Sequence, residues 1–189
     1  PYTTSSNTIG GHVEAGAGVG INQNKHIVGI AKAYLTYVGR GPLPTEIESS
    51  LAEKIREKGQ EYGTTTGRPR RIGWIDLVQL KHANQINVFT ELVLTKVDVL
   101  SGLSKIKMCV GYTINNERVD SVPSDLERFG QVEPVYETVE GWESLPKKIN
   151  SIDECPVQLK AFIKKIEETT GNHISLISYG PDRNQTFKV

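Results

Sequence analysis

The sequence predicts an α/β fold in which a mostly parallel sheet is flanked by helices and extended by a small antiparallel hairpin. Three observations predict this class. Strand-like apolar stretches alternate with stretches of helical periodicity, polar residues follow directly after the most apolar stretch, and an asparagine pair separates two strand-like stretches. With 189 residues the chain is long enough for one ample domain and short for two, so we expect residues 1–189 to form a single domain.

The composition is that of an ordinary globular protein, with 37% hydrophobic and 23% charged residues. Because 22 Lys and Arg residues are balanced by 22 Asp and Glu residues, we expect no general affinity for nucleic acid or membrane surfaces. No apolar run approaches the ~20 residues of a membrane-spanning helix. Cys109 and Cys155 lack metal-ligand spacing and are typical of reduced thiols in an intracellular protein.

The first segment of the chain predicts a loop followed by a helix. Residues 3–20 combine a Thr/Ser/Asn run with five glycines, which favours a tight loop, although a flexible linker fits the composition equally well. Apolar residues between Lys25 and Val38 fit one broad helical face. The glycines and prolines between Gly39 and Thr45 then end this helix.

Two further helices are expected on either side of a short polar loop. Ser49 or Ser50 can cap a mostly solvated helix over residues 51–62, and Gly63 is suited to end it. The next helix is expected over residues 74–87.

The second half of the chain predicts most strands of the sheet. Residues 88–94 are nearly all apolar, as in a buried strand, and Asn115 and Asn116 join two strand-like stretches into a hairpin. Pro156 and Gly171 mark the limits of the clearest helix, and Trp142 is expected to anchor the packing of an irregular segment. Strands are expected over residues 88–94, 106–112, 118–122, 135–139, 174–178 and 185–189.

The polar loop after Gly63 has the composition of an anion-binding site. Its two glycines let the backbone approach a ligand, so that N–H groups can point at an oxyanion. Residues 64–66 add three hydroxyls, while Arg68 and Arg70 carry planar guanidinium groups suited to carboxylate or phosphate. A solvated basic turn between two helices is the alternative, but Pro69 stiffens a loop that would then need no fixed shape.

Thr95–Asp98, directly after the strand expected over residues 88–94, has the (Asn/Thr)-Lys-x-Asp form of the guanine-recognition turn in GTP-binding proteins. Asp98 can accept from two edge N–H groups of guanine, and Lys96 can lay its stem across the base. An ordinary turn is the alternative, and the position after a buried strand favours the binding site. Ser178–Arg183 is a second strand-end loop, for which a purely structural turn is the simpler explanation when it is considered alone.

No nucleophile, general base or metal centre can be assembled from this sequence, so we expect no catalytic residue and no metal ligand in it. The histidines have neither a helical i, i+4 pairing nor a cysteine partner at zinc spacing. A glycine-rich phosphate loop followed by Lys and Ser or Thr is also absent. The four histidines are His12, His26, His82 and His173.

Six motifs together resemble the adenylosuccinate synthetase family. They occur in the family's order, run from the first residues to the last, and are highly specific as a set. The motifs are Thr4–Thr8, Val38–Glu46, Gly63–Asp76, Leu94–Leu100, Pro134–Glu137 and Ile177–Arg183. The resemblance implies the P-loop-NTPase-like fold of that family with its N-terminal part absent, so we expect the C-terminal part of a longer polypeptide.

The resemblance implies GTP-dependent ligation of IMP and L-aspartate to adenylosuccinate, the first committed step from IMP to AMP. GTP would phosphorylate the 6-oxygen of IMP, and the amino group of aspartate would displace phosphate from 6-phosphoryl-IMP. A cytoplasmic homodimer is implied, as are Mg²⁺ ligands, a phosphate loop and catalytic residues in the missing N-terminal part. The fragment alone is therefore expected to be inactive. The alternative is a non-catalytic nucleotide-binding or interaction module on the same scaffold.

The resemblance assigns ligands to three groups of residues. The aspartate loop would comprise Thr64, Thr65, Thr66, Gly67, Arg68, Pro69 and Arg70. IMP would contact Thr4, Val38 and Arg68. GTP would contact Arg70, Lys96, Val97, Asp98, Ser178, Tyr179 and Gly180. Pro69 departs mildly from the family pattern, because some members have a basic residue there.

Overall fold

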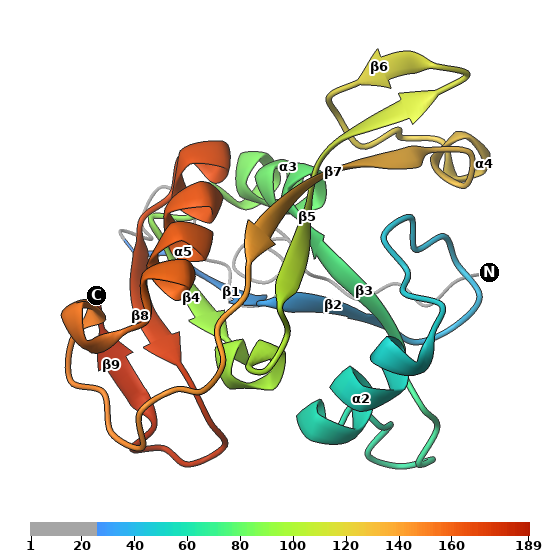
Figure 1. Cartoon of the computed structure of the whole chain (residues 1–189). Coiled ribbons are helices and arrows are strands. Elements are labelled where there is room, and N and C mark those ends of the chain that lie inside the picture. The colour runs from blue at the N-terminus through green and yellow to red at the C-terminus, as the bar shows by residue number, and fades with distance from the viewer. Residues whose placement is uncertain (1–25) are drawn as a thin grey trace, which may run out of the picture.

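The structure, a computed structural model, describes residues 26–189 of the chain (Figure 1). The loop expected over residues 3–20 lies outside the described residues, as do Thr4 and His12. Among residues 26–189, a pair of sheets lie side by side, and helices pack against both of them (Figure 1).

The first sheet has the strand order β1-β4-β8-β9. Strands β1, β4 and β8 run parallel, and β9 is antiparallel to β8. Because the three parallel strands point the same way, their carboxyl ends meet at one edge of the sheet. The strands are β1 (Val28–Lys32), β4 (Glu91–Thr95), β8 (Ile174–Ser178) and β9 (Thr186–Lys188).

The second sheet has the order β2-β3-β5-β6, with β7 on the other side of β5. Only β3 and β5 are parallel in it, so antiparallel pairing extends beyond the predicted hairpin, while the α/β class is confirmed. The hairpin itself is confirmed: Asn115 and Asn116 have φ of 52° and 65°, the left-handed values of a tight two-residue turn. The strands are β2 (Tyr34–Tyr37), β3 (Arg71–Asp76), β5 (Lys105–Ile114), β6 (Glu117–Val119) and β7 (Glu133–Glu140).

The helices end where local signals predict, with one exception. The Ser49 hydroxyl caps α2, and Gly171, with φ of 75°, ends α5. The exception is Gly63, because α2 already ends at Gly59, where Gln60 takes the left-handed conformation. The α-helices are α2 (Ser50–Gly59), α3 (Leu77–Asn87), α4 (Leu126–Phe129) and α5 (Val157–Thr170), and the short 3₁₀ helices are η2 (Val97–Leu100) and η3 (Ile152–Glu154).

The helix predicted between Lys25 and Val38 is wrong. Residues 28–37 form strands β1 and β2, which belong to different sheets, with Ala33 between them. Its apolar residues fit a helical face, but branched and aromatic side chains also favour strands, and the pairing partners of β1 and β2 lie far along the chain.

The helix predicted over residues 74–87 begins only at Leu77, because residues 71–76 form β3 between β2 and β5. The polar loop is therefore bracketed by a helix and a strand rather than by two helices. The strand predicted over residues 88–94 likewise starts three residues later, because Val88 ends α3 with a left-handed backbone.

One cluster of buried apolar side chains includes residues from both sheets and from α2, α3 and α5. Trp142 is fully buried in it, packs edge-on against Phe162 and donates its indole N–H to the carbonyl of Val97 at 3.2 Å. Trp142 thus packs its own irregular segment against the core, as predicted, and it also contacts the turn after β4. Cys109 and Cys155 are buried free thiols. No helix in residues 26–189 is long and apolar enough to cross a membrane. The single-domain organisation stays a prediction.

Val88→Gly tests whether local backbone strain limits stability. Val88 is exposed and has φ of 54°, a region that costs a residue with a side chain roughly 1–2 kcal/mol. We expect the substitution to raise the free energy of unfolding by about 1 kcal/mol, measured by urea unfolding. The control is Val157→Gly, which replaces another exposed valine, in the first turn of α5, and should lower stability. Equal losses for both variants would contradict the assignment of strain to Val88.

Candidate functional site

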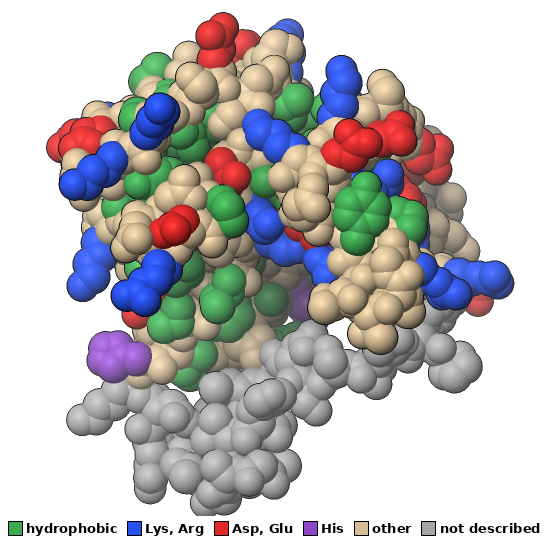
Figure 2. Space-filling model, turned by 90° about the horizontal axis from the view of Figure 1, so that it is seen from below, with side chains coloured by type: hydrophobic (Ala, Val, Ile, Leu, Met, Phe, Trp, Pro, Cys, Tyr) green, Lys and Arg blue, Asp and Glu red, His purple; other side chains and the backbone are tan. Residues whose placement is uncertain are grey.

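Six of the sequence-predicted ligand residues, Lys96, Val97, Asp98, Ser178, Tyr179 and Gly180, lie at or just after the ends of β4 and β8, at the edge of the first sheet where β1 also ends. Lys32 at the end of β1 pairs with Thr95 at the end of β4, and Leu94 pairs with Ile177 near the end of β8. Figure 2, seen from below the view of Figure 1, shows Lys and Arg side chains around the hollow in the middle of this face. This edge is where open α/β sheets bind ligands.

The polar loop is folded back on itself between α2 and β3. Tyr62 and Pro69 form an antiparallel bridge, and inside it the N–H of Gly63 donates to the carbonyl of Arg68 at 2.8 Å. Gly67 has φ of 64° and donates to the carbonyl of Gly63 at 2.8 Å. The three threonines and Arg68 at its tip are exposed. The loop therefore has a fixed base and presents its hydroxyls and one guanidinium to solvent.

Arg70 is held at the base of the loop by a buried carboxylate. Glu61 is 1% exposed, and it accepts from Arg70 Nη1 at 2.5 Å, Lys32 Nζ at 2.8 Å and the Tyr34 hydroxyl at 2.8 Å. Arg56 adds a hydrogen bond to the carbonyl of Arg70 at 2.8 Å. The Glu61 carboxylate thus connects the loop to the junction of β1 and β2.

These contacts set the protonation state of Glu61. Burial alone raises the pKa of its carboxyl group, but the hydrogen bonds from Lys32, Tyr34 and Arg70 and the charge of Lys32 outweigh burial and lower it. Burial and the Glu61 carboxylate raise the pKa of the Tyr34 phenol. Glu61 is therefore an anion and Tyr34 a neutral donor at neutral pH.

The turn after β4 leaves one carboxylate oxygen without a partner. Lys96 adopts the left-handed conformation with φ of 65°, and its Nζ donates to the carbonyl of Gly59 at 3.0 Å, at the end of α2. Asp98 Oδ1 is buried and has no hydrogen-bond partner among the described residues. A buried acceptor without a donor costs about 1–3 kcal/mol, so Asp98 is suited to a ligand that brings a donor.

The turn after β8 offers mainly backbone groups. The Tyr179 ring is buried against Phe187, and its hydroxyl accepts from the N–H of Ile149 at 3.0 Å. A Cβ at Gly180 would meet the amide end of the Gln185 side chain, which would have to move. The Ser178 hydroxyl donates to the carbonyl of Gly180 at 3.3 Å, so a ligand would meet main-chain atoms here.

Val38 lies at the other end of the candidate site. It directly follows β2, which pairs antiparallel with β3, so Val38 and Arg70 lie at the same end of this strand pair. Its side chain is 64% exposed. Arg71 forms an ion pair with Glu46 and donates to the carbonyl of Gly41 at 2.6 Å, which fixes the segment after Val38.

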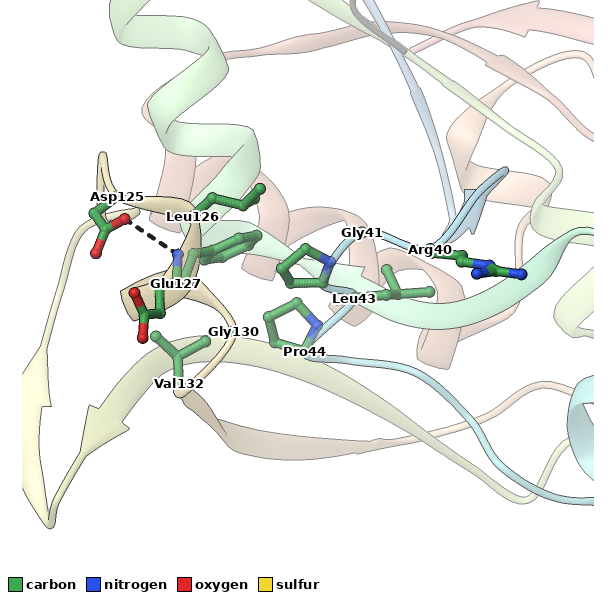
Figure 3. Close-up of a pocket in the computed structure, with 11 residues that line it drawn as sticks. Arg40, Gly41, Leu43, Pro44, Asp125, Leu126, Glu127, Gly130 and Val132 are labelled. Atoms are coloured by element: carbon green, nitrogen blue, oxygen red, sulfur yellow. Dashed lines mark hydrogen bonds between the residues drawn. The ribbon is translucent and has the colours of Figure 1, made fainter. Parts of the chain in front are cut away.

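A separate cavity of about 700 Å³ lies between the Arg40–Pro44 loop and α4 (Figure 3). Asp125 on its wall accepts from the N–H of Glu127 at 3.2 Å. None of the sequence-predicted ligand residues lines this cavity, so we place no predicted ligand in it.

Sequence reasoning missed Glu61, Lys32 and Tyr34. Glu61 was expected on a mostly solvated helix, and the other two were assigned to a helix that is absent. The several arginines of the polar loop were a usable signal for such a partner. Where an arginine at the base of a loop is partly buried, a carboxylate is needed nearby to balance its charge.

No cluster of three or more His, Cys, Asp or Glu side chains that could hold a metal occurs in residues 26–189. His173 lies at the surface and contacts Glu167 at 2.9 Å. The expectation of Mg²⁺ ligands elsewhere in the polypeptide stays a prediction.

Comparison with known proteins gives one consistent result. The family model described as adenylosuccinate synthetase matches residues 1–187. The chain is 50% identical over 189 residues to adenylosuccinate synthetase of Clostridium perfringens and 45% identical over 187 residues to that of Caldanaerobacter subterraneus. These alignments cover 100% and 99% of this chain but 44% of each relative, so the chain spans less than half the length of the curated relatives it matches.

Solved structures agree with the fold. Fully ligated adenylosuccinate synthetase from Plasmodium falciparum superposes with a TM-score of 0.94 at 40% identity, covering 100% of this chain and 46% of that one. This match confirms the fold implied by the resemblance. Succinoaminodeoxyadenylate synthetase of cyanophage S-2L matches with a TM-score of 0.53 at 16% identity, which shows a shared fold only.

Glu61→Gln is expected to make stability depend less on pH. Because the folded-state pKa of Glu61 is lowered, its anion stabilises the fold above the ordinary carboxyl pKa of about 4.3, and this contribution is lost as the pH falls through the folded-state pKa. The wild type should exceed the variant in free energy of unfolding by about 2–4 kcal/mol at pH 7, and the difference should shrink below about pH 4. Urea unfolding between pH 7 and pH 3 measures this difference.

Asp76→Asn serves as the control with opposite sign. Asp76 is buried at the start of α3, and burial raises its pKa despite hydrogen bonds from Tyr112 and Gln79. Asp76 binds its proton more tightly in the folded state than in the unfolded state. The free energy of unfolding of the wild type should therefore rise relative to that of Asp76→Asn as the pH falls. A difference for Glu61→Gln that widens on acidification would contradict the account of Glu61.

Proposed function

The chain belongs to the adenylosuccinate synthetase family, and from this membership we propose that it carries the aspartate loop and guanine pocket of a GTP-dependent ligase. The proposed reaction joins IMP and L-aspartate and yields adenylosuccinate, GDP and phosphate. The chain spans 44% of the relatives' length. The reaction is therefore proposed for the full-length native protein that contains this chain. The homodimer and the cytoplasmic location stay predictions.

The unpartnered oxygen of Asp98 is the observation that carries the proposal. It lies in the turn that follows β4, two residues after Lys96, and β4 pairs in parallel with β8, so the turns after both strands leave the same edge of the sheet. Guanine has a ring N–H and an amino group on one edge, whereas adenine has an acceptor in place of the ring N–H. A carboxylate here therefore favours guanine, because adenine would leave the carboxylate unpaired.

The polar loop is proposed to bind L-aspartate. Exposed threonine hydroxyls, the Arg68 guanidinium and the backbone of a loop with a fixed base are donors suited to two carboxylates. We assign IMP to the segment that begins at Val38, with Arg68 shared between the two substrates. Arg70, held by Glu61 at the base of the loop, is placed between the aspartate and GTP regions.

In the proposed reaction N1 of IMP loses its proton, the 6-oxygen attacks the γ-phosphorus of GTP, and the bond from that phosphorus to GDP breaks. The nitrogen of aspartate then attacks C6 of 6-phosphoryl-IMP, phosphate leaves with the 6-oxygen, and the nitrogen loses a proton. The described residues bind and orient the base and the aspartate. Mg²⁺ would supply charge neutralisation at the phosphates, with ligands outside residues 26–189.

Calorimetric titration of the chain with GDP, GTP and ATP tests the guanine pocket. We expect binding of GDP and GTP but not of ATP, and a loss of about 10- to 100-fold in Asp98→Asn, because the amide places a donor against the guanine donors. Asp120→Asn is the matched control, since Asp120 is an exposed carboxylate paired with Arg118, and it should bind like the wild type. Equal affinity for ATP, or full affinity in Asp98→Asn, would contradict the assignment.

Arg68→Ala tests the aspartate loop in the longest native polypeptide that contains this chain. Losing a charged donor to a carboxylate should raise the KM for L-aspartate by about 10- to 100-fold, measured by initial rates of adenylosuccinate formation. Arg128→Ala, which removes an exposed arginine from α4, should leave this KM unchanged. An unchanged KM in Arg68→Ala would remove Arg68 from the proposed site.

A further inference from the structure

Glu61 belongs to none of the ligand groups proposed above, yet it is a buried charged residue that contacts Arg70, a member of two of them. Its side chain is 2% exposed, while those of its partners Lys32 and Arg70 are 31% and 29% exposed. The carboxylate thus lies behind the two cations, and each cation keeps some of its surface toward solvent. Glu61 thus orients Lys32 and Arg70 while some of their N–H groups stay available for other hydrogen bonds.

Arg70 can hold Glu61 and a ligand at the same time. Its contact with Glu61 uses Nη1, and a guanidinium has five N–H donors in a rigid fork. An arginine that is free in solution loses up to ~2 kcal/mol of side-chain entropy when it is ordered. Because Glu61 orders Arg70 before a ligand arrives, binding does not have to supply that ordering.

The same carboxylate connects the loop to the guanine turn. Lys32, which donates to Glu61, pairs with Thr95 in the strand register, and the next residue, Ala33, donates its N–H to the Thr95 carbonyl at 2.9 Å. Lys96 in turn donates to the carbonyl of Gly59, two residues before Glu61. Two independent chains of contact therefore join Glu61 to the turn that holds Asp98.

We propose that Glu61 is a positioning residue for the ligation reaction: its carboxylate fixes the Arg70 guanidinium between the aspartate loop and the guanine turn. This inference rests on the proposed function, because it assigns Arg70 a role toward the substrates. Glu61 itself touches no substrate and acts through Arg70. If Glu61 only stabilised the fold, its substitution would change kcat/KM by the same factor whether or not Arg70 is present. A positioning role predicts a larger effect when Arg70 is present.

A double-mutant cycle in the longest native polypeptide that contains this chain tests the proposal. The variants are Glu61→Gln, Arg70→Ala and the pair, and the readout is kcat/KM for L-aspartate at a temperature where urea titrations show each variant to be folded. We expect Glu61→Gln to lower kcat/KM by about 30-fold or more when Arg70 is present, and by less than about threefold in the Arg70→Ala background. Should Glu61→Gln fail to fold, Glu61→Asp, which retracts the carboxylate from Arg70, takes its place in the cycle.

Glu46→Gln is the matched control, because Glu46 holds the neighbouring Arg71 and makes no contact with Arg70. In the double variant Glu46→Gln/Arg70→Ala, the fold-loss in kcat/KM should equal the product of the losses in the two single variants. Multiplicative effects for Glu61 and Arg70 in an active wild type would overturn the positioning role alone. A wild type that forms no adenylosuccinate would overturn the proposed function, and this inference with it.

Discussion

A carboxylate removed from water raises the free energy of the fold unless donors surround it, and Glu61 is surrounded by three. Those donors come from the end of β1, the start of β2 and the polar loop. Satisfying one anion therefore fixes three segments that lie apart in the sequence. The direction of Arg70 and the attachment of the polar loop to the junction of β1 and β2 depend on this interaction, while backbone hydrogen bonds fix the base of the loop.

The parallel strands extend that constraint to the second half of the site. Because Lys32 pairs with Thr95, the end of β1 that contacts Glu61 also lies beside the start of the turn after β4. Trp142 supports the turn from beneath by bonding the carbonyl of Val97, while Asp98 keeps one oxygen unpaired. Asp98 Oδ1 is thus one of the few buried side-chain oxygens that has no hydrogen-bond partner among the described residues.

The sequence predicts what local interactions determine. The Ser49 cap, the Gly171 stop and the asparagine turn are each encoded within a few residues, so they are confirmed, as is the α/β class. The helix predicted between Lys25 and Val38 is wrong because the strands found there depend on partners elsewhere in the chain. Glu61 was missed for the same reason: Lys32 and Tyr34 are 29 and 27 residues away, and their convergence requires the assembled sheets.

A direct measurement of the Glu61 carboxyl group tests this account most sharply. Carbon-detected NMR of the chain, titrated from pH 7 to pH 2, follows the side-chain carboxyl carbon of Glu61, assigned with the Glu61→Gln variant. The account predicts a titration midpoint below the ordinary glutamate value of about 4.3, because Lys32, Tyr34 and Arg70 all favour the anion. A midpoint at or above that value would show that the three donors do not hold Glu61 as described, and that the polar loop and the turn after β4 are not joined through it.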